Sequence, residues 1–366
     1  MTRSTRIYGK VPLLMAGILA ASVLLTLAVG VDRRPAGKTR IVASFYPVYI
    51  AALNLADGVE GVEVVSLTGP TTGCLHDYQL SPDNRITLSG ASVLAVNGAG
   101  AESFLDGVLA QSPDLPVVDT SAGVPLIESG EHHEHEGHDH SEQEEVFYNE
   151  HIWTSPDRYR RQVENLRDGL CRHDPAHAKQ YEENAAAYIR QIEVIGGRLK
   201  AAAASLPFKT CVTFHDSLSY MAADWGLTVA ASLSIGEESG VSAADLAQAE
   251  QQAKAAGQIL LLYDSQYPVE YAYVGASARE SRVLALRTGV SGDPVPSAWL
   301  DAMTYNLSLL EETRRFWAGT VGRLRIKTPL PELDAYMNGW ALYQALACRL
   351  MARTSIYHSG GAYGFR

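Results

Sequence analysis

The chain has 366 residues, of which 46% are apolar and 19% are charged, and its formal net charge at pH 7 is −11. This composition is ordinary for a globular protein, and the length is sufficient for two domains with separate cores. The negative charge argues against nucleic acid or an anionic membrane surface as a partner and favours a protein that attracts cations.

The N-terminal segment is predicted to export the chain. Arg3, Arg6 and Lys10 precede an uncharged, mostly apolar run over residues 11–31. A basic region followed by a long apolar region is typical of a signal peptide, and this run is long enough to span a bilayer if it is not cleaved. Residues 1–37 are therefore expected to be a signal peptide or an N-terminal membrane anchor, without a cysteine for lipid modification. We expect the rest of the chain in the periplasm or at the outer face of the cytoplasmic membrane.

Residues 38–155 are predicted to form a first α/β lobe. Apolar runs indicate strands, and the segment from Tyr46 has the spacing of a helix. One run is almost entirely apolar, as in a parallel sheet that is covered on both faces. The strands are expected at residues 41–45, 62–67, 91–97 and 116–119.

The middle of the chain changes in character twice. Residues 121–148 are rich in Gly, Glu, His and Ser, which predicts a mobile surface loop with its His-rich part at 128–145. Five of the chain's 11 histidines fall within residues 131–140. From Pro156 the pattern is helical, interrupted at Asp174-Pro175. We expect linking helices over residues 156–206.

A second α/β lobe is predicted over residues 207–315. Its expected elements are a strand at 210–214, a helix at 243–256, a strand at 259–263 and a closing helix at 299–310. The predicted fold is thus two Rossmann-like α/β lobes joined by a long helix. Ligands of open α/β sheets bind beyond the carboxyl ends of the strands, so the predicted site is the cleft between the lobes.

Three histidines lie in separate short segments that suit a metal ligand. His76 follows a turn at a predicted strand end, His151 precedes the helix start at Pro156, and His215 follows the strand at 210–214. A single histidine is usually structural, but the three together, beside a His-rich run, indicate a metal of the zinc kind.

Six segments resemble the family of zinc/manganese ABC transporter solute-binding proteins (cluster A-I, or cluster 9). The resemblance implies two lobes with a rigid connecting helix, metal held between them at His76, His151 and His215, and no enzymatic activity. It also implies a monomer that delivers the metal to an ABC permease. The matching segments are residues 44–47, 74–82, 97–102, 151–156, 215–220 and 305–307.

The ligand chemistry favours Zn²⁺ over Mn²⁺. Three neutral imidazoles suit zinc, whereas manganese prefers more carboxylate oxygen; the manganese-binding relatives carry Glu where His215 stands. One position departs from the family, because Arg287 stands where a fourth ligand, Asp, is expected. The site then has three histidines and water, or uses Asp264 or Asp293. Asp264 also has a structural interpretation, as a buried acid that accepts hydrogen bonds.

Two alternatives to a transport function remain open. The first is a periplasmic or surface zinc buffer without an importer. The second is a zinc hydrolase, since three histidines plus water also describe a catalytic zinc site. A hydrolase needs a general base, and Glu150 and Asp216 are adjacent to candidate ligands. A residue next to a ligand usually points elsewhere, however.

The C-terminal segment, residues 316–366, does not fit the solute-binding family. Residues 326–329, 338–349 and 357–366 resemble part of a glycoside phosphorylase of the cellobiose phosphorylase and cyclic glucan synthase kind. The match lacks the barrel and the catalytic acid of those enzymes, so we expect an extraneous tail without activity. The four cysteines are scattered without a CxxC pair, which favours free thiols over disulfides.

Overall fold

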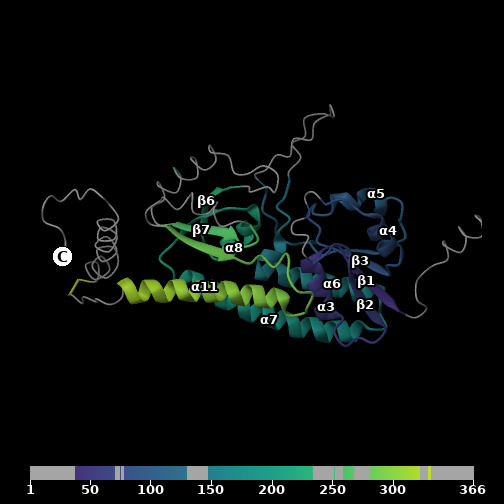
Figure 1. Cartoon of the computed structure of the whole chain (residues 1–366). Coiled ribbons are helices and arrows are strands. Elements are labelled where there is room, and N and C mark those ends of the chain that lie inside the picture. The colour runs from purple at the N-terminus through teal and green to yellow at the C-terminus, as the bar shows by residue number, and fades with distance from the viewer. Residues whose placement is uncertain are drawn as a thin grey trace, which may run out of the picture.

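In a computed structural model, the chain forms two α/β lobes above a group of long helices (Figure 1). The structure describes residues 38–70, 75, 78–129, 147–233, 251, 259–267, 281–321 and 329–330. The predicted N-terminal export segment, the His-rich run at 131–140, the predicted helix at 243–256 (apart from residue 251) and nearly all of the tail lie outside the described residues.

The first lobe contains a parallel four-stranded sheet with the strand order β2-β1-β3-β4. Its central strands carry apolar side chains on both faces and are the most deeply buried, as the apolar runs predict. The strands are β1 (Thr39–Ala43), β2 (Val62–Ser66), β3 (Val93–Val96) and β4 (Val117–Asp119). The helices of this lobe are α3 (Tyr46–Leu55), α4 (Pro82–Ser89), the one-turn η1 (Ser103–Leu105) and α5 (Asp106–Leu109).

The second lobe repeats this plan with the strand order β6-β5-β7-β8, again all parallel. The two outer strands were not predicted from the sequence, because each has a mixed polar and apolar pattern at the sheet edge. The strands are β5 (Thr210–Thr213), β6 (Thr228–Ser232), β7 (Ile259–Asp264) and β8 (Ser281–Leu286), and the short helices are η3 (Asp216–Leu218) and α8 (Ser219–Asp224).

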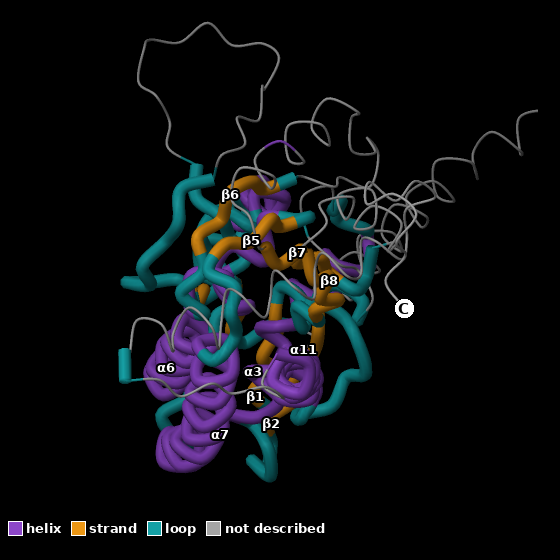
Figure 2. Tube along the Cα trace, turned by 90° about the vertical axis from the view of Figure 1, so that its left-hand side faces the viewer, coloured by secondary structure: helices purple, strands orange, loops and turns teal. Residues whose placement is uncertain are grey.

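Three long helices connect the lobes: α6 (Pro156–His173), α7 (Ala178–Ala204) and α11 (Ala298–Val321). At 27 residues, α7 is about 40 Å long and can extend beneath both lobes. Helices α6 and α11 both pack against α7, and Figure 2 shows all three on one side of the second sheet. The predicted two-lobe fold with a long connecting helix is therefore confirmed, and α11 is longer than the helix predicted at 299–310.

Local sequence fixes where α6 begins, directly after the segment that carries His151. The Ser155 hydroxyl accepts a hydrogen bond from the Arg158 backbone N–H, and Pro156 occupies the first turn. The same hydroxyl donates to the Asp224 carboxylate on α8 at 2.5 Å. The helix cap therefore also connects α6 to the second lobe.

One apolar core continues from the first lobe through the long helices into the second lobe. Trp299, at the start of α11, stacks on Tyr159 of α6 with ring centroids 4.3 Å apart. Its indole N–H donates to the Trp153 carbonyl at 3.0 Å, and the Tyr159 hydroxyl donates to the Pro47 carbonyl at 3.1 Å. These contacts fix the helices relative to both lobes.

Glu102 is a buried carboxylate that organises the segment before His151. It accepts hydrogen bonds from the Ser44 hydroxyl (2.6 Å) and from the backbone N–H groups of Asn97 (2.7 Å) and Gly98 (3.0 Å). The Asn97 amide then donates to the Glu150 carbonyl at 2.9 Å. Burial raises the pKa of Glu102 to about 7, although the hydrogen bonds oppose this shift.

Cys171 and Cys211 are free thiols, as expected, and burial raises the pKa of Cys211 to about 12. Among the described residues no helix is long and apolar enough to cross a membrane.

Glu102 should make the stability depend on pH. Its folded-state pKa lies above the ordinary value of 4.5. The stability that the protonated carboxyl contributes to the folded state is therefore fully present below about pH 4.5 and is lost as the pH rises through about 7. Urea unfolding from pH 4.5 to 8 should show wild type losing up to about 3 kcal/mol relative to Glu102→Gln, which cannot ionise. The exposed Glu183→Gln variant should follow wild type. Parallel profiles for wild type and Glu102→Gln would contradict this assignment.

Two helical glycines should respond oppositely to substitution by alanine. A Cβ at Gly169 on α6 would lie 2.4 Å from Val118 Cγ2 on β4, whereas a Cβ at Gly197 on α7 meets no atom within 4 Å. Gly169→Ala should lower the free energy of unfolding by about 1–3 kcal/mol through overpacking. Gly197→Ala should raise it by up to about 1 kcal/mol through helix propensity. Chemical denaturation measures both, and a stabilising Gly169→Ala would show that α6 does not pack closely on β4.

Candidate metal site

His151 is completely buried at the end of the segment that enters α6. It directly precedes the one-turn helix η2 (Ile152–Thr154), and its Nδ1 atom lies 3.0 Å from the Asn149 side-chain oxygen. The amide nitrogen of Asn149 donates to the Asp216 carbonyl at 2.9 Å, which fixes the orientation of the amide. An oxygen facing Nδ1 requires a proton on Nδ1, so Nε2 of His151 carries the lone pair that can bind a metal.

His215 is buried at the carboxyl end of β5, where the strand gives way to η3. Its Nδ1 atom accepts a hydrogen bond from the Ser217 backbone N–H at 3.1 Å and lies 3.0 Å from Asp216 Oδ1. Its ring stacks on Tyr267 with centroids 5.2 Å apart. An Nδ1 atom that accepts from Ser217 carries the lone pair, and the ring proton is then on Nε2. Nε2 becomes available as a metal ligand in the other tautomer, in which Nδ1 carries the proton and donates it to the Asp216 carboxylate.

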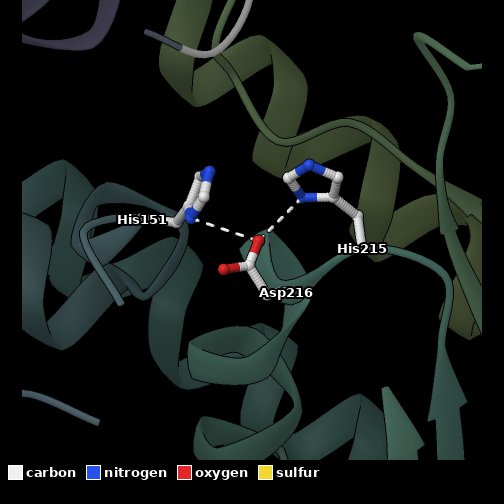
Figure 3. A group of neighbouring side chains, drawn as sticks. All are labelled: His151, His215 and Asp216. Atoms are coloured by element: carbon white, nitrogen blue, oxygen red, sulfur yellow. Dashed lines mark ion pairs between the residues drawn. The ribbon is translucent and has the colours of Figure 1, made fainter. Parts of the chain in front are cut away.

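The Asp216 carboxylate lies between the two imidazoles (Figure 3). Its Oδ1 atom is 3.0 Å from His215 Nδ1 and 3.4 Å from His151 Nδ1. The ring centroids of the two histidines are 5.2 Å apart, at an angle of 90°. In Figure 3 each ring turns one nitrogen toward Asp216 and the other away from it, on a common side. Within the described part of the chain, these three residues form a group that could hold a metal ion.

The position of Asp216 differs from the sequence-based expectation that a residue next to a ligand points elsewhere. In an extended strand successive side chains do point to opposite faces. Here η3 begins at Asp216 itself, so the chain curls immediately after His215 and returns the carboxylate toward the Nδ1 atom. Sequence periodicity could not reveal this contact, since the helix is only three residues long.

The remaining candidate ligands have other surroundings. His76 lies outside the described residues. Asp264 is buried and accepts hydrogen bonds from the Gln266 backbone and side chain and from the Thr288 hydroxyl, at 2.8 to 3.1 Å. Burial raises the pKa of this carboxyl despite those bonds. These contacts agree with the structural interpretation of Asp264 as a buried acceptor.

Asp293 and Arg287 are both exposed. The backbone carbonyl of Asp293 accepts a hydrogen bond from the Tyr46 hydroxyl at 2.6 Å, which connects the two lobes. The Arg287 guanidinium lies 4.1 Å from the centre of the Tyr305 ring on α11, a cation–π contact.

The arrangement predicts a supporting role for Asp216, in which it orients both rings so that their Nε2 atoms meet the metal. Asp216→Asn should weaken Zn²⁺ binding by about 10- to 100-fold, the usual effect of losing an outer carboxylate partner. Isothermal titration calorimetry measures this change. The exposed Asp168→Asn variant on α6 should bind like wild type. An affinity for Asp216→Asn equal to that of wild type would show that the carboxylate does not orient the rings.

A family model described as the zinc-uptake complex component A, periplasmic, matches residues 41–313. A second model, the catalytic domain of the glycosyl hydrolase 94 superfamily, matches residues 316–366. Both resemblances predicted from the sequence are therefore confirmed, with the boundary between them at 313–316.

Two curated relatives show how far the similarity extends. The iron-binding protein YfeA of Yersinia pestis is 30% identical over 216 residues, which cover 57% of this chain and 65% of YfeA. The zinc-binding lipoprotein AdcA of Streptococcus pneumoniae serotype 4 is 26% identical over 322 residues, covering 83% of this chain and 61% of AdcA. The chain thus spans less than two thirds of the length of either relative.

Solved structures share the fold. The solute-binding protein FpvC from Pseudomonas aeruginosa, in complex with Mn²⁺, matches with a TM-score of 0.64 at 22% identity, covering 76% of this chain and 99% of FpvC. ZnuA matches with a TM-score of 0.59 at 22% identity, covering 75% of this chain and 98% of ZnuA. The matched family is one of solute-binding proteins and not of enzymes. Because its model spans well over half of the sequence, the chain belongs to the periplasmic zinc-uptake complex component A family.

Proposed function

We propose that this chain is an extracytoplasmic solute-binding protein that captures Zn²⁺ and delivers it to the permease of an ABC importer. The observation that supports this function best is that two histidines, one before the connecting helices in the chain and one after them, lie close together. His151 precedes α6 and His215 follows β5, yet their ring centroids are 5.2 Å apart and both Nδ1 atoms approach one carboxylate. Such a site binds and releases an ion without covalent chemistry.

The third ligand in this proposal is His76, which joins His151 and His215. Three imidazoles and an open fourth position fit the tetrahedral preference of zinc. The relatives have names that point to several metals, since YfeA is called iron-binding, AdcA zinc-binding, and FpvC was solved with Mn²⁺. The nitrogen-rich ligand set supports Zn²⁺ as the cargo and makes Mn²⁺ the weaker competitor.

The lobes are proposed to close only slightly around the ion. Several hydrogen bonds already connect them: Tyr46 to the Asp293 carbonyl (2.6 Å), the Asn54 amide to the Pro296 carbonyl (2.8 Å), and the Gly292 N–H to the Pro70 carbonyl (3.2 Å). The continuous core along α7 opposes a large hinge motion. Zinc binding would therefore mainly order the segments beside the site.

The His-rich part at 128–145 is proposed to collect zinc weakly near the cleft. The chain pairs where this part begins and ends: Ser129 N–H donates to the Phe147 carbonyl at 2.8 Å, and Asn149 N–H donates to the Ile127 carbonyl at 2.9 Å. Asn149 also contacts His151. This short ladder brings the two described ends of the segment close to the residues that hold His151, and the tight site itself is proposed not to require the run.

The cellular setting follows from the same proposal. Residues 1–37 direct export, residues 38–155 and 207–315 form the two lobes with residues 156–206 between them, and the chain acts as a monomer that docks on the permease. Residues 316–366 take no part in metal capture.

Calorimetric titration of the purified protein with Zn²⁺ and with Mn²⁺ tests this function. Wild type should show one tight Zn²⁺ site above a background of weak sites, with Mn²⁺ binding more weakly. His215→Ala should lose more than about 100-fold in affinity at the tight site, because a ligand contributes more than an outer partner does. His173→Ala, on the exposed end of α6, should match wild type.

Deletion of residues 131–140 separates the two kinds of binding. The deleted protein should retain the tight site and lose weak ones. If wild type shows only weak binding at several sites, unchanged in His215→Ala, then the His-rich run is the metal binder and the proposed site is wrong.

A further inference from the structure

A tyrosine on the second lobe holds two segments that lie far from it in the chain. Tyr220 belongs to α8, shortly after His215, and its side chain is fully buried. Its hydroxyl donates a hydrogen bond to the Asn149 carbonyl at 2.6 Å and accepts one from the Ile127 backbone N–H at 3.0 Å. These bonds cross 71 and 93 positions of sequence, so one side chain joins three separate parts of the molecule.

The Tyr220 hydroxyl is inserted into a backbone pair. Ile127 and Asn149 lie on antiparallel segments, and the Asn149 N–H donates directly to the Ile127 carbonyl at 2.9 Å. In a regular hydrogen-bonded antiparallel pair, the two residues exchange a second bond of the same kind. Here the hydroxyl relays that second bond, since it accepts from the Ile127 N–H and donates to the Asn149 carbonyl. The position of Asn149 is therefore set by the second lobe as well as by its neighbouring segment.

The Tyr220 ring is itself held in place. The Arg158 guanidinium lies 4.6 Å from the centre of this ring, which is a cation–π contact. The same guanidinium donates to the Asp224 carboxylate on α8 at 3.0 Å. Burial raises the pKa of Tyr220, although the Ile127 hydrogen bond and the charge of Arg158 oppose this shift. The hydroxyl therefore keeps its proton and remains a donor to Asn149.

Asn149 connects this hydroxyl to the histidine segments. Its side-chain oxygen accepts from the His151 backbone N–H at 2.9 Å and lies 3.0 Å from His151 Nδ1. Its amide nitrogen donates to the Asp216 carbonyl at 2.9 Å. Asp216 begins η3, which leads directly into α8. The contacts thus form a closed circuit from Tyr220 through Asn149 to the residue that follows His215.

We propose that the Tyr220 hydroxyl is a positioning group that sets the separation of His151 and His215 before the metal arrives. The inference rests on the proposed function, in which both imidazoles bind Zn²⁺. Without the hydroxyl, the Ile127 N–H and the buried Asn149 carbonyl lose their shared partner, which is costly enough to move the segment. The His151 ring then shifts relative to His215. Ligands that are ordered in advance bind an ion more tightly than ligands that must be ordered on binding.

Zinc titration of Tyr220→Phe in the purified protein tests the proposal. Calorimetry should show the tight Zn²⁺ site weakened by about 10-fold. Tyr181→Phe is the matched control, because Tyr181 is also fully buried and its hydroxyl donates to the Asp174 carboxylate at 2.9 Å, between α6 and α7. Both variants lose a buried hydrogen bond and should unfold at a lower urea concentration than wild type. Only Tyr220→Phe should bind zinc more weakly.

NMR of the metal-free protein separates positioning from general stability. The imidazole signals of His151, assigned with His151→Ala, should shift in Tyr220→Phe and stay in place in Tyr181→Phe. A tight zinc site that is equally strong in wild type and Tyr220→Phe, or unshifted His151 signals, overturns the inference alone. The absence of a tight zinc site in wild type overturns the proposed function and the inference together.

Discussion

The contact of one carboxylate with two imidazoles organises the centre of this molecule. Asp216 Oδ1 lies 3.0 and 3.4 Å from the Nδ1 atoms of His215 and His151, which belong to segments far apart in the chain. Bringing them together requires the second sheet, η3 and the start of α6 to be fixed relative to one another. Many of the hydrogen bonds around the two histidines join the segment before α6 to η3 and α8.

Asn149 shows how this fixing is achieved with few groups. Its side-chain oxygen accepts from the His151 backbone and faces the imidazole, while its amide nitrogen donates to the Asp216 carbonyl. Its own carbonyl accepts from the Tyr220 hydroxyl at 2.6 Å. The Thr154 hydroxyl adds a bond to the Ser217 carbonyl at 2.8 Å. The two histidines are thus held by a continuous network of hydrogen bonds.

The junction with the phosphorylase-like segment lies inside a helix. The solute-binding match ends at residue 313 and the glycosyl hydrolase match begins at 316, whereas α11 continues from Ala298 to Val321. The first half of α11 carries Trp299, Met303, Leu307 and Leu310 into the shared core. The end of α11 therefore extends from a segment that the shared core already holds in place.

Local patterns in the sequence determined the lobes, the long helices and the segments that carry His151 and His215. Apolar runs mark β1, β3 and β7 because these strands are buried on both faces, and helical spacing marks α7 because one face enters the core. The edge strands β6 and β8 escaped prediction, since a partly exposed strand has no such pattern. Tertiary structure alone decided that Asp216 turns back between the imidazoles, that Asp264 accepts hydrogen bonds from Gln266 and Thr288, and that the Arg287 guanidinium lies on the Tyr305 ring. These contacts join residues through the packing of separate strands and a one-turn helix, and no periodicity along the chain encodes them.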